Sequence, residues 1–321
     1  MKIAMVGAGA AGSVFASYLR RGGADMTLVD LYKAHMDKVA ADGMDFTIAP
    51  DRHYHVDGFK TAYNADSIGI QDIVIFVTKA TQIESALEAA KPCIGPDTVL
   101  VSLMNGVGNE DYLLKAVDGK HVIYGSGTLG TALPEPGKCI SSPGLDEIQM
   151  NFGPVEKCEL TDRAGKHLEK CFNEGGCPSK YWDDVRLPVW TKATVNCTFN
   201  PLSAILRMKV NVMENNEYGW TLIEQMTREC CAVANAKGVA LDADYLIAAY
   251  HQSAGTPISN YYPSMAQDML IHERQTEINT LNGVISRYGK ELGIPTPLND
   301  IIFNMVSATQ LNYDKLFPKV Q

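Results

Sequence analysis

A chain of 321 residues is long enough to form two domains, each with its own buried core. Its 46% hydrophobic and 20% charged residues are ordinary for a globular protein, and a formal net charge of -9 without a basic stripe argues against a nucleic-acid partner. No apolar stretch approaches the length of a membrane span, so we expect no membrane partner.

The cysteines and the first residues bear on the cellular compartment. The eight cysteines form neither a CxxC pair nor a cluster at zinc spacing, so we expect reduced thiols, no metal site and a cytoplasmic location. The apolar start of the chain resembles a signal peptide, but its glycines interrupt the apolar run and Arg20-Arg21 fits the end of a helix. We therefore do not expect secretion.

The first thirty residues predict a strand, a glycine-rich turn and a helix. Lys2 to Val6 is a short apolar run, and a helical pattern from Ser13 to Arg21 follows the turn. The first glycine allows the tight turn, the second lets the backbone approach a pyrophosphate, and the third lets helix and sheet pack closely. The residues expected to bind a dinucleotide here are Gly7, Ala8, Gly9, Ala10, Ala11 and Gly12.

A second predicted strand, Met26 to Val29, ends on an acidic residue, Asp30. A carboxylate at this position can accept hydrogen bonds from the ribose hydroxyls and would repel a 2′-phosphate, so we expect NAD in preference to NADP. The alternative is a glycine-rich turn that binds nothing. Because strand, helix and acid fall in register, the dinucleotide site is favoured.

Beyond a predicted helix from Tyr32 to Asp42, residues 44–57 alternate in the manner of a small strand pair. His53 and His55 lie in this pair, two positions apart. Such spacing could serve a metal. Without an acidic or thiol partner at helical spacing, two exposed strand histidines are the favoured interpretation.

Two β-branched runs, Ile73 to Val77 and Thr98 to Leu103, are typical of strands buried on both faces of a parallel sheet. The first run is followed by the polar residue Lys79 and the second by Asn105. Both residues are expected at the carboxyl edge of the sheet, where open α/β sheets bind ligands. The alternatives are an exposed lysine that opens a helix and an ordinary Asn-Gly turn.

The remaining pattern divides the chain at about residue 184. Before it we expect a strand, a hairpin from Lys138 to Phe152, a helix and an edge strand; after Pro188 only helices follow, with breaks at Pro257, Pro263, Gly293 and Pro295. The predicted fold class is α/β, with a Rossmann-type dinucleotide-binding domain over 1–184 and an all-helical substrate and catalytic domain over 185–321. We expect the site between them. The other ranges are strands at 121–128 and 180–182 and helices at 160–173, 189–207, 215–237, 242–252, 262–293 and 298–316.

The first helix of the second domain carries the candidate chemistry. Lys192, Asn196 and Asn200 are spaced four and four, so they project from one face of a helix whose apolar neighbours imply burial. A buried lysine is costly unless it is paired or neutralised, and therefore suggests a function. The alternative is a lysine that extends to solvent beside two surface asparagines. Glu277 is an available partner, although it could equally be an acid that stabilises a helix N-terminus.

Taken together, these motifs resemble the ketopantoate reductase family over nearly the whole chain. The resemblance rests on the glycine turn, Thr78-Lys79-Ala80, Asn105-Gly106-Val107-Gly108, Trp190-Thr191-Lys192 with Asn196 and Asn200-Pro201-Leu202, and Ser264-Met265-Ala266-Gln267-Asp268 with Thr276-Glu277-Ile278. It implies NAD(P)H-dependent reduction of ketopantoate to pantoate in pantothenate biosynthesis, and it leaves a homodimer open.

The resemblance also assigns roles to single residues. It implies that Lys192 donates the proton, that Glu277 completes the catalytic site, and that Asn105, Asn196, Asn200 and Ser264 bind the substrate. It places Lys79, Asn105, Thr131 and Glu277 near the cofactor. This sequence departs from the family pattern at Asn279, which stands where an aspartate is usual, and in one extra residue between Ser264 and Glu277.

Two other functions compete with this interpretation. An NAD-dependent D-2-hydroxyacid dehydrogenase acting on branched or aromatic 2-oxoacids would share the same machinery. A non-catalytic NAD(H) sensor would need the glycine turn but not Lys192, Asn196, Asn200 and Glu277.

Overall fold

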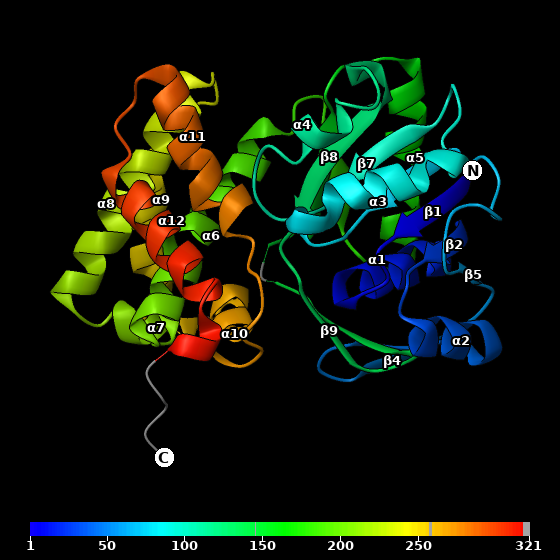
Figure 1. The fold of residues 1–321 in the computed structure, drawn as a ribbon, viewed down its shortest axis with the longest axis horizontal. Coiled ribbons are helices and arrows are strands. Elements are labelled where there is room, and N and C mark those ends of the chain that lie inside the picture. The colour runs from blue at the N-terminus through cyan, green and yellow to red at the C-terminus, as the bar shows by residue number, and fades with distance from the viewer. Residues whose placement is uncertain (145, 257–258, 317–321) are drawn as a thin grey trace. The chain divides into compact units, whose positions relative to one another are not determined.

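The computed structural model describes residues 1–144, 146–256 and 259–316, so Pro257 lies outside the described residues. The chain divides into two compact units (Figure 1). The first comprises Met1–Met104 and Gly108–Val185, and the second comprises Asn105–Val107 and Arg186–Gln321. The short segment Asn105–Val107 thus belongs with residues that are distant from it in the sequence.

The first unit is built on an eight-stranded sheet in the order β12-β11-β8-β7-β6-β1-β2-β5. The run from β8 to β5 is parallel, and its order is that of the dinucleotide-binding Rossmann fold; β11 pairs antiparallel with β8. The strands are β1 (Lys2–Val6), β2 (Asp25–Val29), β5 (Lys60–Ala62), β6 (Ile73–Phe76), β7 (Val99–Ser102), β8 (Val122–Gly127), β11 (Met150–Pro154) and β12 (Ser179–Tyr181).

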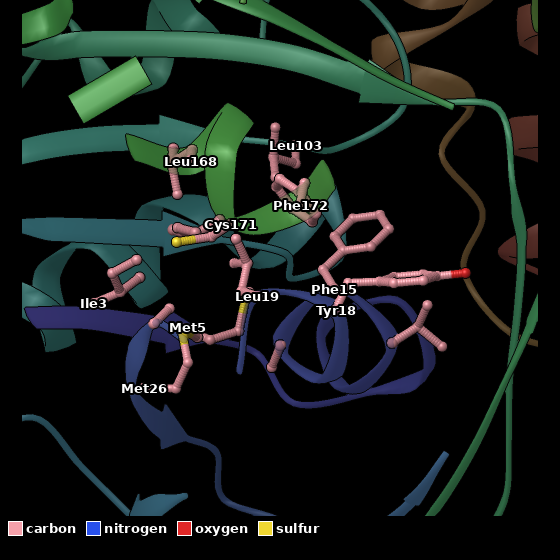
Figure 2. Packing of buried hydrophobic residues seen from close by; sticks show 14 of the residues in the cluster. Ile3, Met5, Phe15, Tyr18, Leu19, Met26, Leu103, Leu168, Cys171 and Phe172 are labelled. Atoms are coloured by element: carbon pink, nitrogen blue, oxygen red, sulfur yellow. The ribbon is translucent and has the colours of Figure 1, made fainter. Parts of the chain in front are cut away.

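Buried clusters lie on both faces of this sheet. Each central strand sends alternate side chains to opposite faces of the sheet. Because both faces are buried, the sequences of these strands are continuous apolar runs. On one face the helices α1 (Ala10–Arg21) and α5 (Glu159–Gly175) pack together, and Figure 2 shows their side chains beside Met5 of β1. Phe15 and Phe172 meet edge to face there, with ring centroids 6.3 Å apart. The other face packs against α3 (Ile83–Ala90) and α4 (Glu110–Leu113).

A four-stranded sheet in the order β4-β3-β10-β9 completes the first unit, together with α2 (Lys33–Asp42). The strand pair predicted within 44–57 is confirmed as β3 (Met44–Ile48) and β4 (Arg52–Val56). The hairpin predicted from Lys138 to Phe152 is wrong. β10 (Lys138–Ser142) forms its hairpin with β9 (Gly130–Glu135), which the sequence pattern missed, and β11 belongs to the other sheet. The residues of β9 face solvent on much of their surface, so they lack the apolar run of a buried strand.

The second unit is helical in its described residues, as predicted. α6 packs against α8, α10 and α12, and α11 packs against α8 and α12. The single helix expected over 262–293 is wrong: α10 ends at Leu270, and Glu277 precedes a short 3-10 turn, Ile278–Thr280, that leads into α11. The helices are α6 (Arg186–Leu206), α7 (Val210–Met213), α8 (Glu217–Ala236), α9 (Ala243–Ser253), α10 (Ser264–Leu270), α11 (Asn282–Leu292) and α12 (Pro297–Gln310).

Two expectations about individual side chains can be compared with the structure. All eight cysteines are free thiols, and seven of them are buried. His53 and His55 are exposed on β4, as expected; His55 lies between Asp45 and Asp57, with its ring nitrogens 2.9 and 3.1 Å from their carboxylates. In the described part of the chain, no helix combines the length and the apolar character needed to cross a membrane.

Candidate functional site

The three glycines of the turn between β1 and α1 have different surroundings. Gly7 has a φ of +96°, which side chains rarely adopt. A Cβ on Gly12 would lie 1.8 Å from the carbonyl oxygen of Gly7, so only glycine fits between the turn and the helix. A Cβ on Gly9 would meet nothing within 4 Å, and Gly9 is exposed. The roles predicted for Gly7 and Gly12 therefore have a steric basis, and the backbone at Gly9 is open to a ligand.

Asp30, the acid that follows β2, holds this turn. Its Oδ2 accepts a hydrogen bond from the backbone N–H of Ala8 at 2.7 Å, and its Oδ1 accepts one from Tyr32 at 2.8 Å. Hydrogen bonds to a charged acceptor are about twice as strong as neutral ones. The carboxylate expected to bind ribose is therefore already oriented by two backbone donors.

The carbonyl of Ala8 is fixed by a buried chain of hydrogen bonds that the sequence did not predict. The backbone N–H of Gly137 donates to Nδ1 of His35 at 3.0 Å, so this nitrogen carries no proton and Nε2 carries it. Nε2 lies 3.0 Å from the hydroxyl of Ser13, which in turn donates to the Ala8 carbonyl at 2.9 Å. The β9–β10 turn is thereby linked to the glycine turn through a neutral His35.

Of the four residues that the resemblance places near the cofactor, Lys79 and Thr131 lie in the first unit. Lys79 is half-buried and follows β6 after Val77 and Thr78, at the carboxyl edge of the parallel strands. Thr131 lies in β9 of the four-stranded sheet, where its partner across the hairpin is Ser141. Tyr18 of α1 donates to the Ser141 hydroxyl at 2.8 Å, so this hairpin is anchored to the helix that begins at the glycine turn.

In the second unit, Lys192, Asn196 and Asn200 lie on one helix, α6, as predicted. Lys192 is half-buried, whereas Asn196 and Asn200 are only 6% and 7% exposed. These polar side chains share one face because four residues advance an α-helix by slightly more than one turn. We call this set the α6 polar face.

Glu277 and Asn105 are brought together although they are distant in the sequence. The side-chain amide of Asn105 donates to the Glu277 carboxylate at 3.2 Å. The backbone of the Asn105 segment is fixed by Thr280, whose carbonyl accepts from the N–H of Val107 at 3.1 Å. Gly106 has a φ of +95°, and a Cβ there would lie 2.1 Å from the same carbonyl. Close approach at Gly106 thus holds Asn105 beside Glu277.

The segment that carries Glu277 is anchored at both sides. Gln310 of α12 accepts hydrogen bonds from the backbone N–H and the hydroxyl of Thr276, at 3.0 and 2.9 Å. Further back, Arg274 donates through Nε to the buried carboxylate of Asp268 at 2.6 Å. Ser264 is the first residue of α10 and is exposed. The hydrogen-bonding residues that place Glu277 were missed because nothing local marks Gln310 as a partner.

This geometry offers two sets of groups with complementary chemistry. The first unit presents backbone N–H groups at a helix N-terminus, which favours a phosphate. The second presents an ammonium, amides and a carboxylate, which suits a small anionic substrate with hydroxyl or carbonyl groups.

Both parts of the chain match models of one protein family. Residues 3–156 match the model described as ketopantoate reductase PanE/ApbA, and residues 184–310 match the model of its C-terminal domain. The 2-dehydropantoate 2-reductase of Lactococcus lactis is 29% identical over 313 residues, which cover 97% of this chain and 98% of that protein.

Solved structures show the same fold over the full length. D-mandelate dehydrogenase in its complex with NADH and anilino(oxo)acetate superimposes with a TM-score of 0.86 at 27% identity, covering 98% of this chain and 99% of the other. The PanE/ApbA family ketopantoate reductase from Ralstonia eutropha superimposes with a TM-score of 0.84 at 27% identity, covering 98% and 100%.

Proposed function

Because this chain belongs to the ketopantoate reductase family of oxidoreductases, we propose that it reduces a 2-oxoacid with a nicotinamide dinucleotide, and that ketopantoate is the first candidate substrate. The observation that carries the proposal is the α6 polar face in the same unit as the Asn105–Glu277 hydrogen bond. Burying polar groups costs free energy unless they are paired, so an ammonium and two buried amides on one helix face support a function there.

The glycine turn fits a dinucleotide. The open space at Gly9 and the N-terminus of α1 suit a pyrophosphate, and the oriented Asp30 carboxylate suits the ribose hydroxyls of NADH better than a 2′-phosphate. Lys79 and Thr131 are proposed to line the same cofactor. NADH in the D-mandelate dehydrogenase complex supports a nicotinamide dinucleotide as the cofactor.

The bound dinucleotide would supply a hydride to the 2-oxo carbon of the substrate. Negative charge would then develop on the carbonyl oxygen, where the Lys192 ammonium can stabilise it and afterwards donate a proton. Asn196, Asn200 and Ser264 are proposed to hold the carboxylate and hydroxyl of the substrate. Glu277 would orient the Asn105 amide through their hydrogen bond. That both units act on one substrate remains part of this proposal.

A D-2-hydroxyacid dehydrogenase is the second candidate, and the D-mandelate dehydrogenase match favours it. Asn279, which replaces the usual aspartate, is exposed two residues after Glu277 and is consistent with an altered substrate preference. A non-catalytic NAD(H) sensor would leave the α6 polar face without a use. A cytoplasmic homodimer is the state that we expect for either enzyme.

Steady-state kinetics on a panel of 2-oxoacids, each with NADH and NADPH, test the proposal. A ketopantoate reductase should lose most of its kcat/KM on 2-oxoacids without the 4-hydroxyl group, because a site built to bind a hydroxyl leaves polar groups unpaired when the hydroxyl is absent. Faster reduction of benzoylformate or branched 2-oxoacids would instead identify the second candidate. No turnover of any 2-oxoacid would refute both.

A further inference from the structure

The helix that carries the α6 polar face contains a proline in its interior, Pro201. Proline has no N–H, so the carbonyl of the residue four positions earlier, Cys197, loses its helical donor. Cys197 is fully buried, and a buried carbonyl without a partner costs about 1–3 kcal/mol. The helix nevertheless continues to Leu206, so another donor must serve this carbonyl.

Asn282, the first residue of α11, supplies that donor. Its side-chain amide lies 2.9 Å from the Cys197 carbonyl oxygen and 2.9 Å from Oδ1 of Asn299. Asn282 and Asn299 are both fully buried, so water does not compete for these bonds. The orphaned carbonyl is therefore paired with a side chain from a different helix.

The orientation of the Asn282 amide is determined by its neighbours. The Glu229 carboxylate, which only accepts, receives the side-chain amide of Asn299 at 2.8 Å and its backbone N–H at 3.0 Å. Oδ1 of Asn299 must then face Asn282, which has to present its NH₂ group. In this orientation the Asn282 amide pairs the Cys197 carbonyl, and its own Oδ1 is left without a hydrogen bond to the described residues.

The paired carbonyl lies in the helical turn between Asn196 and Asn200, two members of the α6 polar face. Cys197 directly follows Asn196, and Pro201 directly follows Asn200. Helices kink at prolines and where a side chain enters the ladder of backbone hydrogen bonds, and both conditions are met at this turn. The hydrogen bond from Asn282 therefore acts on the turn that sets the relative positions of the Asn196 and Asn200 side chains.

We propose that Asn282 is a positioning residue: by pairing the Cys197 carbonyl that Pro201 leaves without a donor, it holds Asn196 and Asn200 in the geometry that binds the 2-oxoacid. The substrate part of this inference rests on the proposed function. The hydrogen-bond part stands on the structure of α6 alone and can be tested without any activity.

A double-mutant cycle provides the test without activity. Pro201→Ala restores an N–H that can reach the Cys197 carbonyl, so it should make Asn282 partly dispensable. We expect Asn282→Leu to lower Tm by roughly 6 °C with Pro201 in place and by roughly half as much in the Pro201→Ala background, where only the bond to Asn299 is lost. Pro188→Ala is the matched control, because a proline in the first turn of the same helix leaves no carbonyl unpaired and should not alter the effect of Asn282→Leu.

Kinetics test the positioning role. Asn282→Leu should lower kcat/KM for the 2-oxoacid about tenfold while changing the Kd of NADH less than twofold, and Pro201→Ala should restore most of the loss. If Asn282→Leu is insoluble, Pro201→Ala and not Pro188→Ala should recover soluble protein.

If Asn282→Leu lowered Tm equally in the wild type, in Pro201→Ala and in Pro188→Ala, the hydrogen-bond part of the inference would be overturned. Coupling in Tm with unchanged kcat/KM would overturn the positioning part, as would an equally large change in the NADH Kd. A wild-type protein that turns over no 2-oxoacid would refute the proposed function, whereas the Tm cycle would still give its answer.

Discussion

The carboxylate of Asp30 lies 2.7 Å from the backbone nitrogen of Ala8, so the acid that follows β2 holds the glycine turn that follows β1. One side chain thereby supports the turn proposed to bind a pyrophosphate, and we propose that it also presents negative charge where a 2′-phosphate would lie. Cofactor preference and turn geometry are both expected to depend on it.

We predict a preference for NADH over NADPH, and we expect Asp30→Asn to shift the ratio of the two kcat/KM values about tenfold toward NADPH. The amide can still accept from Ala8 but no longer repels a phosphate. Asp51→Asn, which removes an exposed acid in the turn before β4, is the control and should leave the ratio unchanged. A tenfold NADPH preference of the wild type would contradict the assignment of Asp30.

The glycines of the turn should respond differently to the same substitution. Gly9→Ala should fold with an unchanged Tm, because nothing lies within 4 Å of the new Cβ, but it should raise the KM for NADH at least about tenfold by obstructing the pyrophosphate. Gly12→Ala forces a Cβ to 1.8 Å from the Gly7 carbonyl and should destabilise the protein by about 3 kcal/mol. Thermal unfolding and NADH titration of both variants check this contrast. Normal NADH binding by Gly9→Ala would show that the turn does not contact the phosphates.

Replacing Lys192 by Ala should lower kcat and kcat/KM together, by about a hundredfold or more, because its contact with the developing alkoxide is strongest in the transition state. NADH binding and Tm should change little. Stopped-flow measurement of the hydride-transfer step distinguishes this from slow product release. A rise in KM alone would make Lys192 an anchor for the substrate carboxylate and leave the proton to another group.

Stability should fall in mild acid because of His35. Burial lowers the pKa of His35 from its ordinary value of 6.5, with Asp30 opposing the shift, so the folded protein binds this proton more weakly than the unfolded chain. The contribution of His35 is therefore fully present above pH 6.5 and is lost as the pH falls through the folded pKa. His55 acts in the opposite direction, because hydrogen bonding to Asp45 and the charge of Asp57 raise its pKa.

Comparing wild type with His35→Gln isolates the contribution of His35. The free energy of unfolding in urea should fall more steeply for the wild type than for His35→Gln between pH 7 and 5. Gln252→Ala, at an exposed and uncharged position of α9, is the control and should keep the wild-type slope. Parallel slopes for all three proteins would contradict the neutral, buried state of His35.

Local signals explain what could be predicted. The run Lys2–Val6, the glycines after it and the helix to Arg21 each carry their own pattern, and α6 presents Lys192, Asn196 and Asn200 on one face because four-residue spacing dictates it. The sequence motif indicates Glu277, and the end of a predicted strand independently indicates its partner Asn105.

Strand pairs and hydrogen bonds between segments that are distant in the sequence could not be predicted from local patterns. The alternation in 138–152 is compatible with a hairpin. Which strands pair depends on the whole fold: β10 pairs with β3 and β9 in one sheet, and β11 pairs with β8 and β12 in the other. Likewise, no local feature of His35 indicates Gly137, and none of Thr276 indicates Gln310. The orphaned carbonyl of Cys197 follows from Pro201 in the sequence, but the identity of its donor requires the fold.

The segment Asn105–Val107 also limits how this protein could exchange parts with its relatives. A fusion joined at Arg186 would bring a foreign helical unit with its own counterpart of Thr280, while Gly106 would still come from the recipient. Recombination at that single point would therefore separate two segments that fit each other closely, since a Cβ on Gly106 would lie only 2.1 Å from the Thr280 carbonyl oxygen. Chimaeras should inherit residues 105–107 together with 186–321, so the heritable module is discontinuous in the gene although it is compact in space.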